Sequence, residues 1–351
     1  MDIDKGSFQS NLELLQKCSS IAVNEDMSDK IMFHENGIGN ISRGRMFTFL
    51  TCEVGVEGVF LIDNILKIVK AMTGDTISLD YSDDELKISS KSKTRLGFKP
   101  IQIENWKSKY IDKPFKYLEG KQPDFKPLPK EFITGLQAVV QCASNSKNLS
   151  ILNSVAVIGD HLIATDNFKI GHYLITSKFK THFLIDEYNI QPIIEFNPAS
   201  YYLDADRILF ERQSETGGTD TMICAINPIG KYPDFLPMLK KSEHEGFKIS
   251  LPEELKELVY IAQQIPGKNE ESKIQLAIGR NKLALSYNTI NGWFKKNLRI
   301  EYDKIPFVIN MNINTLSNGL KDIGTDIYIS KEETGMMRLH AFTYVFPIEI
   351  I

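Results

Sequence analysis

The side chains that most often carry out catalysis or bind metals are scattered along this chain of 351 residues. Its six histidines, at positions 34, 161, 172, 182, 244 and 340, follow no metal-binding spacing. The densest carboxylate cluster, DYSDDE at 80–85, lacks the spacing and the glycine of an EF-hand calcium loop, and we interpret it as an acidic turn between two strands. No GxxxxGK(S/T), HExxH or GxSxG motif is present. The sequence therefore predicts no enzymatic activity, no metal and no cofactor.

The cysteines give no sign of a zinc site or a disulfide framework. Cys18, Cys52, Cys142 and Cys224 stand far apart and form no CxxC pair. We expect four reduced and mostly buried thiols, as in a cytoplasmic protein. The sequence also contains no apolar run of about 18 residues and no secretory-signal pattern, so we expect no membrane span.

The net charge of −4 argues against a protein that coats nucleic acid with its whole surface. It does not exclude a basic stripe on one face, because local fields rather than net charge decide binding. Lysines do recur opposite the apolar side of predicted helices. Lys67 and Lys70 lie opposite one apolar stripe, and Lys17 lies opposite Leu12 and Leu15.

The elements that carry these lysines belong to a sequence motif that the chain repeats. FLIDNILKIVKAM begins at position 60, FLIDEYNIQPIIEF at 183 and FVINMNINTLSNGL at 307, so the offsets are 183 − 60 = 123 and 307 − 183 = 124 residues. Each copy reads as an apolar strand that meets a residue suited to a helix N-cap (Asp63, Asp186 or Asn310) and continues with helical spacing. A second helix and several short strands recur around each copy of the motif. This pattern predicts three repeated α+β domains of roughly 120 residues each.

The domain boundaries are expected where proline, glycine and charged residues cluster, near GKQPDFKPLP and KKSEHEG. The predicted domains are therefore 1–122, 123–241 and 242–351. Pro192 falls inside the repeated helix of the second copy, and we expect it to delay the start of that helix or to bend it.

Three local motifs carry a resemblance to a known family. LNSVAVIGDHLIATDNFKIG at 152–171, GKYPDFLPML at 230–239 and the final YVFPIEII are similar to the LNG…ATDGHRLA stretch, the G-(R/K)-(F/Y)-P-D-Y element and the ending of the sliding clamps of bacterial DNA polymerases. The chain resembles this processivity-factor beta subunit family, in a phage-encoded or divergent form. The resemblance implies a head-to-tail homodimer of three-domain subunits, closed into a ring with helices inside and antiparallel sheets outside. Its implied partners are encircled double-stranded DNA, a DNA polymerase and a clamp loader.

A ring of this kind must attract DNA weakly and without reading its sequence, so lysines on the inner helices suffice. The candidate DNA-binding residues are Lys17, Lys67, Lys70, Lys130, Lys147 and Lys321. The helix PEELKELV carries three glutamates against one lysine, which weakens the contribution of the third domain to the attraction for DNA.

The resemblance also implies a cleft between the second and third domains that binds a short peptide of a partner protein. By match of motif, its residues are Leu152, Thr165, Phe168, Lys169, Ile170, Pro233, Met238, Tyr344, Phe346, Pro347 and Ile348. The subunit contact is expected at KTRLGFK in the first domain, with Leu96 and Phe98 as candidates and Ile265 as the candidate on the third domain.

The chain departs from the family motif at the cleft. The family's Gly-His-Arg-Leu is Asn-Phe-Lys-Ile here, at 167–170, and Glu349 replaces a basic residue. Lysine lacks the forked donors of arginine, and phenylalanine makes the pocket more apolar. We therefore hypothesise that the cleft prefers its own partners' peptide over the standard bacterial motif.

Two alternatives stay open. Three similar domains could instead serve assembly, as in a structural component of a phage virion. Some clamps are trimers of two-domain subunits, although three repeats in one chain favour a dimer. A clamp should stay on nicked circular DNA and leave once the circle is cut, whereas a virion protein should show no such dependence.

Overall fold

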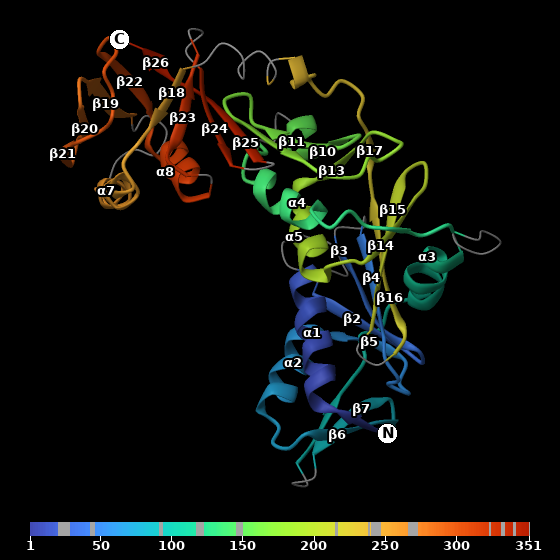
Figure 1. The fold of residues 1–351 in the computed structure, drawn as a ribbon. Helices are drawn as coiled ribbons and strands as arrows, with labels where there is room; N and C mark the ends of the chain where they lie inside the picture. The colour runs from blue at the N-terminus through green and yellow to red at the C-terminus, as the bar shows by residue number, and fades with distance from the viewer. Residues whose placement is uncertain are drawn as a thin grey trace. The chain divides into compact units, whose positions relative to one another are not determined.

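The computed structural model describes residues 1–19, 29–42, 46–90, 94–116, 123–144, 150–214, 217–237, 239, 247–265, 273–322, 324–330, 334–339 and 342–350. The chain folds into two compact units (Figure 1). Unit 1 comprises Met1–Ile133 and Ile185–Pro228, and unit 2 comprises Thr134–Leu184 and Ile229–Ile351. Among the described residues, no helix has both the length and the apolar character needed to cross a membrane.

Unit 1 contains two antiparallel sheets. Their strands run in the orders β1-β6-β7-β8 and β5-β2-β3-β4-β16-β15-β14-β9. The elements of this unit are β1 (Asp2–Asp4), α1 (Lys5–Ser19), β2 (Lys30–His34), β3 (Gly37–Ser42), β4 (Met46–Thr51), β5 (Gly58–Leu61), α2 (Ile62–Ala71), β6 (Thr76–Ser82), β7 (Glu85–Ser90), β8 (Arg95–Phe98), the short helix η1 (Lys107–Asp112), α3 (Lys113–Lys116), β9 (Lys126–Pro127), α5 (Glu187–Phe196), β14 (Ser200–Leu203), β15 (Arg207–Gln213), β16 (Thr219–Ala225) and β17 (Asn227–Pro228).

Unit 2 repeats the same kinds of element. One of its sheets runs β10-β11-β12-β25-β24-β23-β18 and the other runs β21-β20-β19-β22-β26. The remaining elements of the chain are α4 (Phe132–Val140), η2 (Ser150–Leu152), β10 (Ser154–Ile158), β11 (His161–Thr165), β12 (Ile170–Leu174), β13 (Phe183–Asp186), β18 (Phe247–Ser250), α7 (Glu254–Gln263), β19 (Lys273–Gly279), β20 (Lys282–Thr289), β21 (Gly292–Leu298), β22 (Phe307–Asn312), α8 (Ile313–Asp322), β23 (Asp326–Ile329), β24 (Thr334–Leu339), β25 (Phe342–Pro347) and β26 (Glu349–Ile350).

The repeated motif forms the same structure three times, a strand followed directly by a helix: β5–α2, β13–α5 and β22–α8. The fold is therefore α+β with repeated domains, as predicted. Two details differ from expectation. Leu61, not Asp63, is the N-cap residue of α2, and the Asn312 carboxamide, not that of Asn310, accepts the free backbone N–H groups at the start of α8. Pro192 lies inside α5, but the helix still starts directly after its strand, at Glu187.

The helices cover one face of each sheet. In unit 1, α1 packs against α2 and α5, with its buried side chains spaced by three or four residues (Phe8, Leu12, Leu15 and Cys18). In unit 2, a Cβ on Gly171 of β12 would lie 3.2 Å from Val139 Cα, so α4 lies directly against that strand. Gly319 lets α8 approach β24 and β25 in the same way.

Within the described parts of the chain, strand pairing crosses the predicted domain boundaries twice. In unit 1, β4 of the first predicted domain pairs with β16 of the second, with Phe47 opposite Ile223. In unit 2, β12 of the second pairs with β25 of the third, with Ile170 opposite Val345. The strands β4 and β12 occupy the same place in successive repeats, as do β16 and β25. Each junction is therefore made by the same two kinds of strand, and the three-domain division itself stays a prediction.

Candidate functional site

An apolar cluster covers the sheet face of unit 2 that lies opposite α4 and α8. Its base is a row of side chains in register across four strands, Thr165, Ile170, Val345 and Met336. Described residues of the segment that follows β17, within 229–239, pack over this row. The cluster consists of Leu152, Ala156, Ile163, Ile170, Leu184, Tyr232, Leu239, Met336 and Val345, with Ile151, Ile158, Ile229, Phe235, Leu236 and Tyr328 partly buried against it.

The structure brings several of the predicted cleft residues to this cluster. Leu152 and Ile170 belong to it, and the turn before β12 lies at its rim. The Asp166 carboxylate accepts the N–H groups of Phe168 and Lys169, and the Lys169 ammonium lies 3.4 Å from the same carboxylate. This turn holds the Phe168 ring 76% exposed. Pro233 and Pro347 are also exposed, whereas Met238 lies outside the described residues.

The structure does not bring Tyr344 and Phe346 into the cluster. Side chains alternate along β25, so Val345 faces the cluster while its two neighbours face the opposite side of the sheet. Tyr344 packs toward Gly319 of α8, and Phe346 packs beside Gly335. Ile348, beyond the end of the strand, is buried. Sequence reasoning missed Val345, Met336, Tyr232 and Leu239, and only the strand register reveals the first two.

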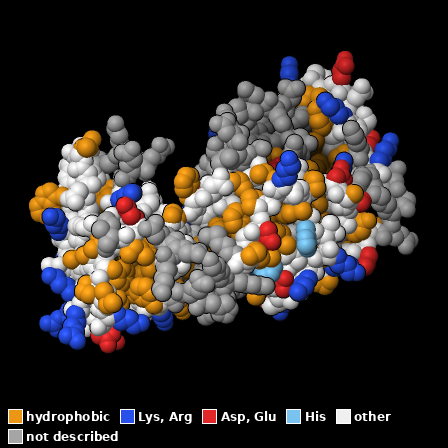
Figure 2. All heavy atoms as spheres, turned by 90° about the horizontal axis from the view of Figure 1, so that it is seen from above, with side chains coloured by type: hydrophobic (Ala, Val, Ile, Leu, Met, Phe, Trp, Pro, Cys, Tyr) orange, Lys and Arg blue, Asp and Glu red, His pale blue; other side chains and the backbone are white. Residues whose placement is uncertain are grey.

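Two histidines lie on the same sheet face, beside the cluster. His161 Nδ1 and His172 Nε2 are 2.8 Å apart on the neighbouring strands β11 and β12, and Asp160 lies 3.5 Å from His161. Burial, the nearby His161 and then Arg338 lower the pKa of His172 to about 4. Figure 2 shows histidine rings at the surface among apolar side chains. Among the described residues, no group of three or more His, Cys, Asp or Glu side chains could hold a metal ion.

The candidate DNA-binding lysines of unit 1 are partly neutralised by acidic side chains on neighbouring helices. Lys17 of α1 lies 2.9 Å from Glu195 of α5, and Lys70 of α2 lies 3.0 Å from Glu13 of α1. The hydrogen bond from Lys17 lowers the pKa of Glu195. Lys67 is exposed on the outer side of α2, opposite its buried apolar stripe.

The other three candidate lysines are spread more widely. Lys130 and Lys321 are exposed, one just before α4 and one in the last turn of α8, while Lys147 lies outside the described residues. On the face seen in Figure 2, several basic side chains gather at the lower left and others lie singly, some of them beside acidic ones.

The candidate contact residues between subunits lie at two sheet edges. β8 is the last strand of its sheet, and its Leu96 is 38% exposed while Phe98 is half-buried. β21 is the last strand of another sheet and exposes Trp293, with Lys295 lying over its ring. Ile265 lies against the start of β21, with its Cγ2 3.2 Å from the place of a Gly292 Cβ. Sequence reasoning missed Trp293 as an exposed aromatic on this edge.

Comparison with solved structures identifies the fold. The chain is similar over 99% of its length to DNA polymerase III beta subunit of Thermotoga maritima (15% identity, TM-score 0.76, 98% of that chain covered) and to the DNA polymerase sliding clamp of Bacillus subtilis (13% identity, TM-score 0.76, 98% covered). It is also similar over 99% of both chains to the Helicobacter pylori beta clamp bound to a DNA ligase peptide (14% identity, TM-score 0.74). No protein-family model and no curated protein sequence matches the chain. The chain thus has the full-length fold of the beta sliding clamps.

Proposed function

We propose that this protein is a DNA sliding clamp, in which two chains join head to tail into a ring around duplex DNA. The observation that carries the proposal is the repeated pairing of strands at the domain junctions. β4 pairs with β16, and β12 pairs with β25. The third repeat has β21 in the place of β4 and β12, and the first repeat has β8 in the place of β16 and β25. Both β21 and β8 lie at a sheet edge. A second copy supplies the missing partner for each edge strand, which also removes two edges that would invite aggregation.

The charges at the two edges do not select this pairing. β21 presents the exposed Lys295 and Lys296, and β8 presents the exposed Arg95, while the acidic turn lies between β6 and β7 with Asp83 paired to Lys87. The proposal of closure therefore rests on the strand order. The resulting assembly is a homodimer with six domains.

In this function the helix layer faces the DNA and the apolar cluster of unit 2 receives partners. Weak, sequence-independent attraction to phosphates suits a ring that must slide, because encirclement rather than affinity keeps it in place. The cluster beside Phe168 and Lys169 would take a short apolar peptide of a DNA polymerase or of a clamp loader. The protein itself would act in the cytoplasm without catalysing a reaction, and its low identity to bacterial clamps fits a divergent or phage-encoded form.

The test compares retention on DNA of different topology. The protein is loaded onto nicked circular DNA, free protein is removed by gel filtration, and half of the sample is then cut once with a restriction enzyme. We expect the protein to elute with the circle and to be lost after the cut. Equal retention on circular and linear DNA, or no retention on either, contradicts the proposal and favours a structural protein built from the same domains.

A further inference from the structure

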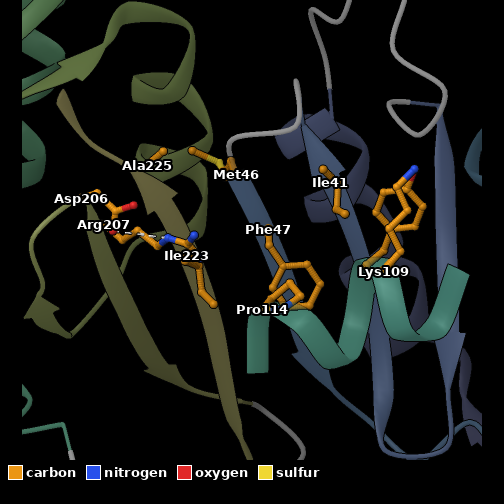
Figure 3. A pocket seen from close by; sticks show the side chains of 10 residues that line it. Ile41, Met46, Phe47, Lys109, Pro114, Asp206, Arg207, Ile223 and Ala225 are labelled. Carbon is orange, nitrogen blue, oxygen red and sulfur yellow. Dashed lines mark ion pairs between the residues drawn. The ribbon is translucent and has the colours of Figure 1, made fainter. Parts of the chain in front are cut away.

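The junction between β4 and β16 in unit 1 carries a pocket that the proposed clamp function does not use. Its volume is about 340 Å³, within the range of roughly 300–1,000 Å³ that is usual for ligand pockets. Figure 3 shows it between the face of these strands and the segment of η1 and α3. The floor is a row of side chains in register, Ile41, Phe47 and Ile223.

This floor corresponds to the base of the apolar cluster in unit 2. Phe47 stands opposite Ile223 across the first junction as Ile170 stands opposite Val345 across the second. In both units, described residues of the segment that links successive repeats pack over part of this row, Tyr110 and Ile111 in unit 1 and Tyr232 and Leu239 in unit 2. In unit 1, Tyr110 and Ile111 of η1 cover it only in part, which leaves the pocket beside them. The two sites therefore have the same origin in the repeat but different side chains.

The polar residues around the pocket give it a positive balance. Lys109 and Arg207 line it together with a single carboxylate, that of Asp206. Arg207 lies 3.6 Å from Asp206, and Lys109 lies over the Tyr110 ring at 4.7 Å. Asp206 is largely exposed, so this ion pair contributes little and can be exchanged for another carboxylate. An excess of positive charge here is a local feature of a chain whose net charge is −4.

From this geometry we infer that the pocket at the β4–β16 junction is a second docking site, for a short peptide segment of a partner protein that carries apolar side chains next to a carboxylate. Its apolar side chains pack on the row of Phe47 and Ile223, and its carboxylate binds Arg207. An arginine can hold a carboxylate through two parallel hydrogen bonds, which makes this contact specific for an acidic segment. A dimer would then hold two partner segments on each chain, at different sites.

Isoleucine methyl NMR on the full chain tests the inference, because each site has its own reporter. Ile41 and Ile223 report on the pocket of unit 1, and Ile170 reports on the cluster of unit 2. The probes are the peptide Glu-Leu-Asp-Leu-Phe and its basic counterpart Lys-Leu-Lys-Leu-Phe. We expect the acidic peptide to shift the Ile41 and Ile223 signals in a saturable way and the basic peptide to have at least about tenfold lower affinity for this site.

Two variants assign the effect to the pocket. Arg207→Glu should weaken the response of Ile41 and Ile223 by about tenfold or more and leave the response of Ile170 unchanged. Ala225→Phe should fill the pocket and abolish that response, while an unchanged signal of Ile77, a buried residue of β6 in the same unit, shows that unit 1 is still folded. Lys169→Glu is the matched control, because it reverses a charge at the rim of the other site.

The outcomes separate this inference from the proposed function. Shifts at Ile170 alone, with Ile41 and Ile223 unmoved up to about 1 mM peptide, overturn the second site and leave the clamp cleft standing. Shifts at Ile41 and Ile223 alone support the second site and leave the cleft to be tested with a peptide of its own partners. Equal affinity for the acidic and basic peptides, or an Arg207→Glu chain that binds as the unchanged protein does, also overturns the inference.

Discussion

Lys17 on α1 and Glu195 on α5 form an ion pair between the first and second predicted domains, with 2.9 Å between Nζ and Oε2. The two residues are 178 positions apart in the chain. Gln191 donates a further hydrogen bond to Glu195, at 2.9 Å. The helix layer therefore neutralises one of its own lysines, and this limits the attraction of that layer for a phosphate backbone.

Glu195→Gln should strengthen the binding of duplex DNA. The substitution keeps the shape of the side chain but releases the charge of Lys17 for a phosphate. We expect the affinity at low salt to rise about two- to fivefold and the slope of log K against log salt to become steeper by up to about 0.9. Fluorescence anisotropy across a salt series measures both quantities.

Glu57→Gln is the matched control for that experiment. Glu57 pairs with Lys107 at 2.6 Å, and both side chains are about half exposed, but Glu57 lies just before β5 and Lys107 in η1, so neither belongs to α1, α2 or α5. Its DNA affinity should equal that of the unchanged protein. If both variants gain affinity alike, the effect is one of net charge and the role assigned to Lys17 is wrong.

Asp220→Asn should destabilise unit 1. The Asp220 carboxylate is 1% exposed, lies 2.9 Å from Arg212 Nε and accepts the backbone N–H of Thr51 at 2.8 Å, so it joins β16 to both of its neighbouring strands. Removal of a buried charge leaves Arg212 without its carboxylate, and we expect a loss of about 3 kcal/mol in the free energy of unfolding. Urea unfolding measures this loss. Asp206→Asn, at an exposed ion pair, should change stability by less than about 0.5 kcal/mol, and similar losses in the two variants would contradict the argument.

Stability should fall in mild acid because of His172. Its folded-state pKa of about 4 lies below the ordinary value of 6.5, so the unfolded chain binds more protons between these pH values. The contribution of this group is complete above about pH 6.5 and is lost as the pH falls toward 4. Between pH 7 and 5 we expect a loss of about 1–2 kcal/mol, since the ring keeps some contact with water.

His172→Gln isolates this contribution. Urea unfolding of the variant should show a smaller loss of stability between pH 7 and 5 than that of the unchanged protein. His182→Gln, at an exposed histidine just before β13, is the control and should keep the original pH dependence. If the His172 variant keeps the pH dependence of the unchanged protein, His172 is not the cause of the loss of stability in acid.

Phe168→Ala should weaken the binding of an apolar peptide to the cluster of unit 2 without affecting the fold. The ring is 76% exposed, so its loss removes little packing, but a bound peptide would cover it. We expect about tenfold weaker binding of a Leu-Phe peptide in a fluorescence titration and an unchanged unfolding midpoint. Ile290→Ala, which truncates an 85% exposed side chain far along the chain, should leave peptide binding as it was. A Phe168 variant that binds the peptide normally would place the docking site elsewhere.

Local sequence patterns were enough to predict the repeated helices but not the contacts between repeats. The strand–helix motifs at α2, α5 and α8 follow from side-chain periodicity within about 15 residues, so they could be predicted from the sequence. The ion pair of Lys17 with Glu195 depends on how two distant helices pack, and no local pattern predicts it. Lys17, Lys67, Lys70 and Lys321 lie on helices, Lys130 lies just before α4 and Lys147 lies outside the described residues, and the contact of these lysines with DNA stays a prediction. The pairing of Lys17 and Lys70 with acidic side chains was not foreseen.

The cleft shows the same limit at the level of a single strand. Alternation predicts that Tyr344 and Phe346 share one face of β25 and that Val345 lies on the other, but it does not say which face meets Ile170. The pairing of Ile170 with Val345 decides this, and it depends on the register between strands from different repeats. The histidine pair on β11 and β12 likewise needs that register to be known.

The central claim is that β8 of one copy meets β21 of another around DNA, and site-specific cross-linking tests it most directly. Arg95→Cys on β8 and Lys295→Cys on β21 place single thiols at the two edges, while the four native cysteines are buried. The variant is loaded on nicked circular DNA and treated with a short bismaleimide, which tolerates an uncertain register. The account predicts cross-linked dimers that stay on the circle at high salt and leave it after a single cut. Cross-links that form only within one chain, or cross-linked protein that salt removes from the intact circle, would contradict it.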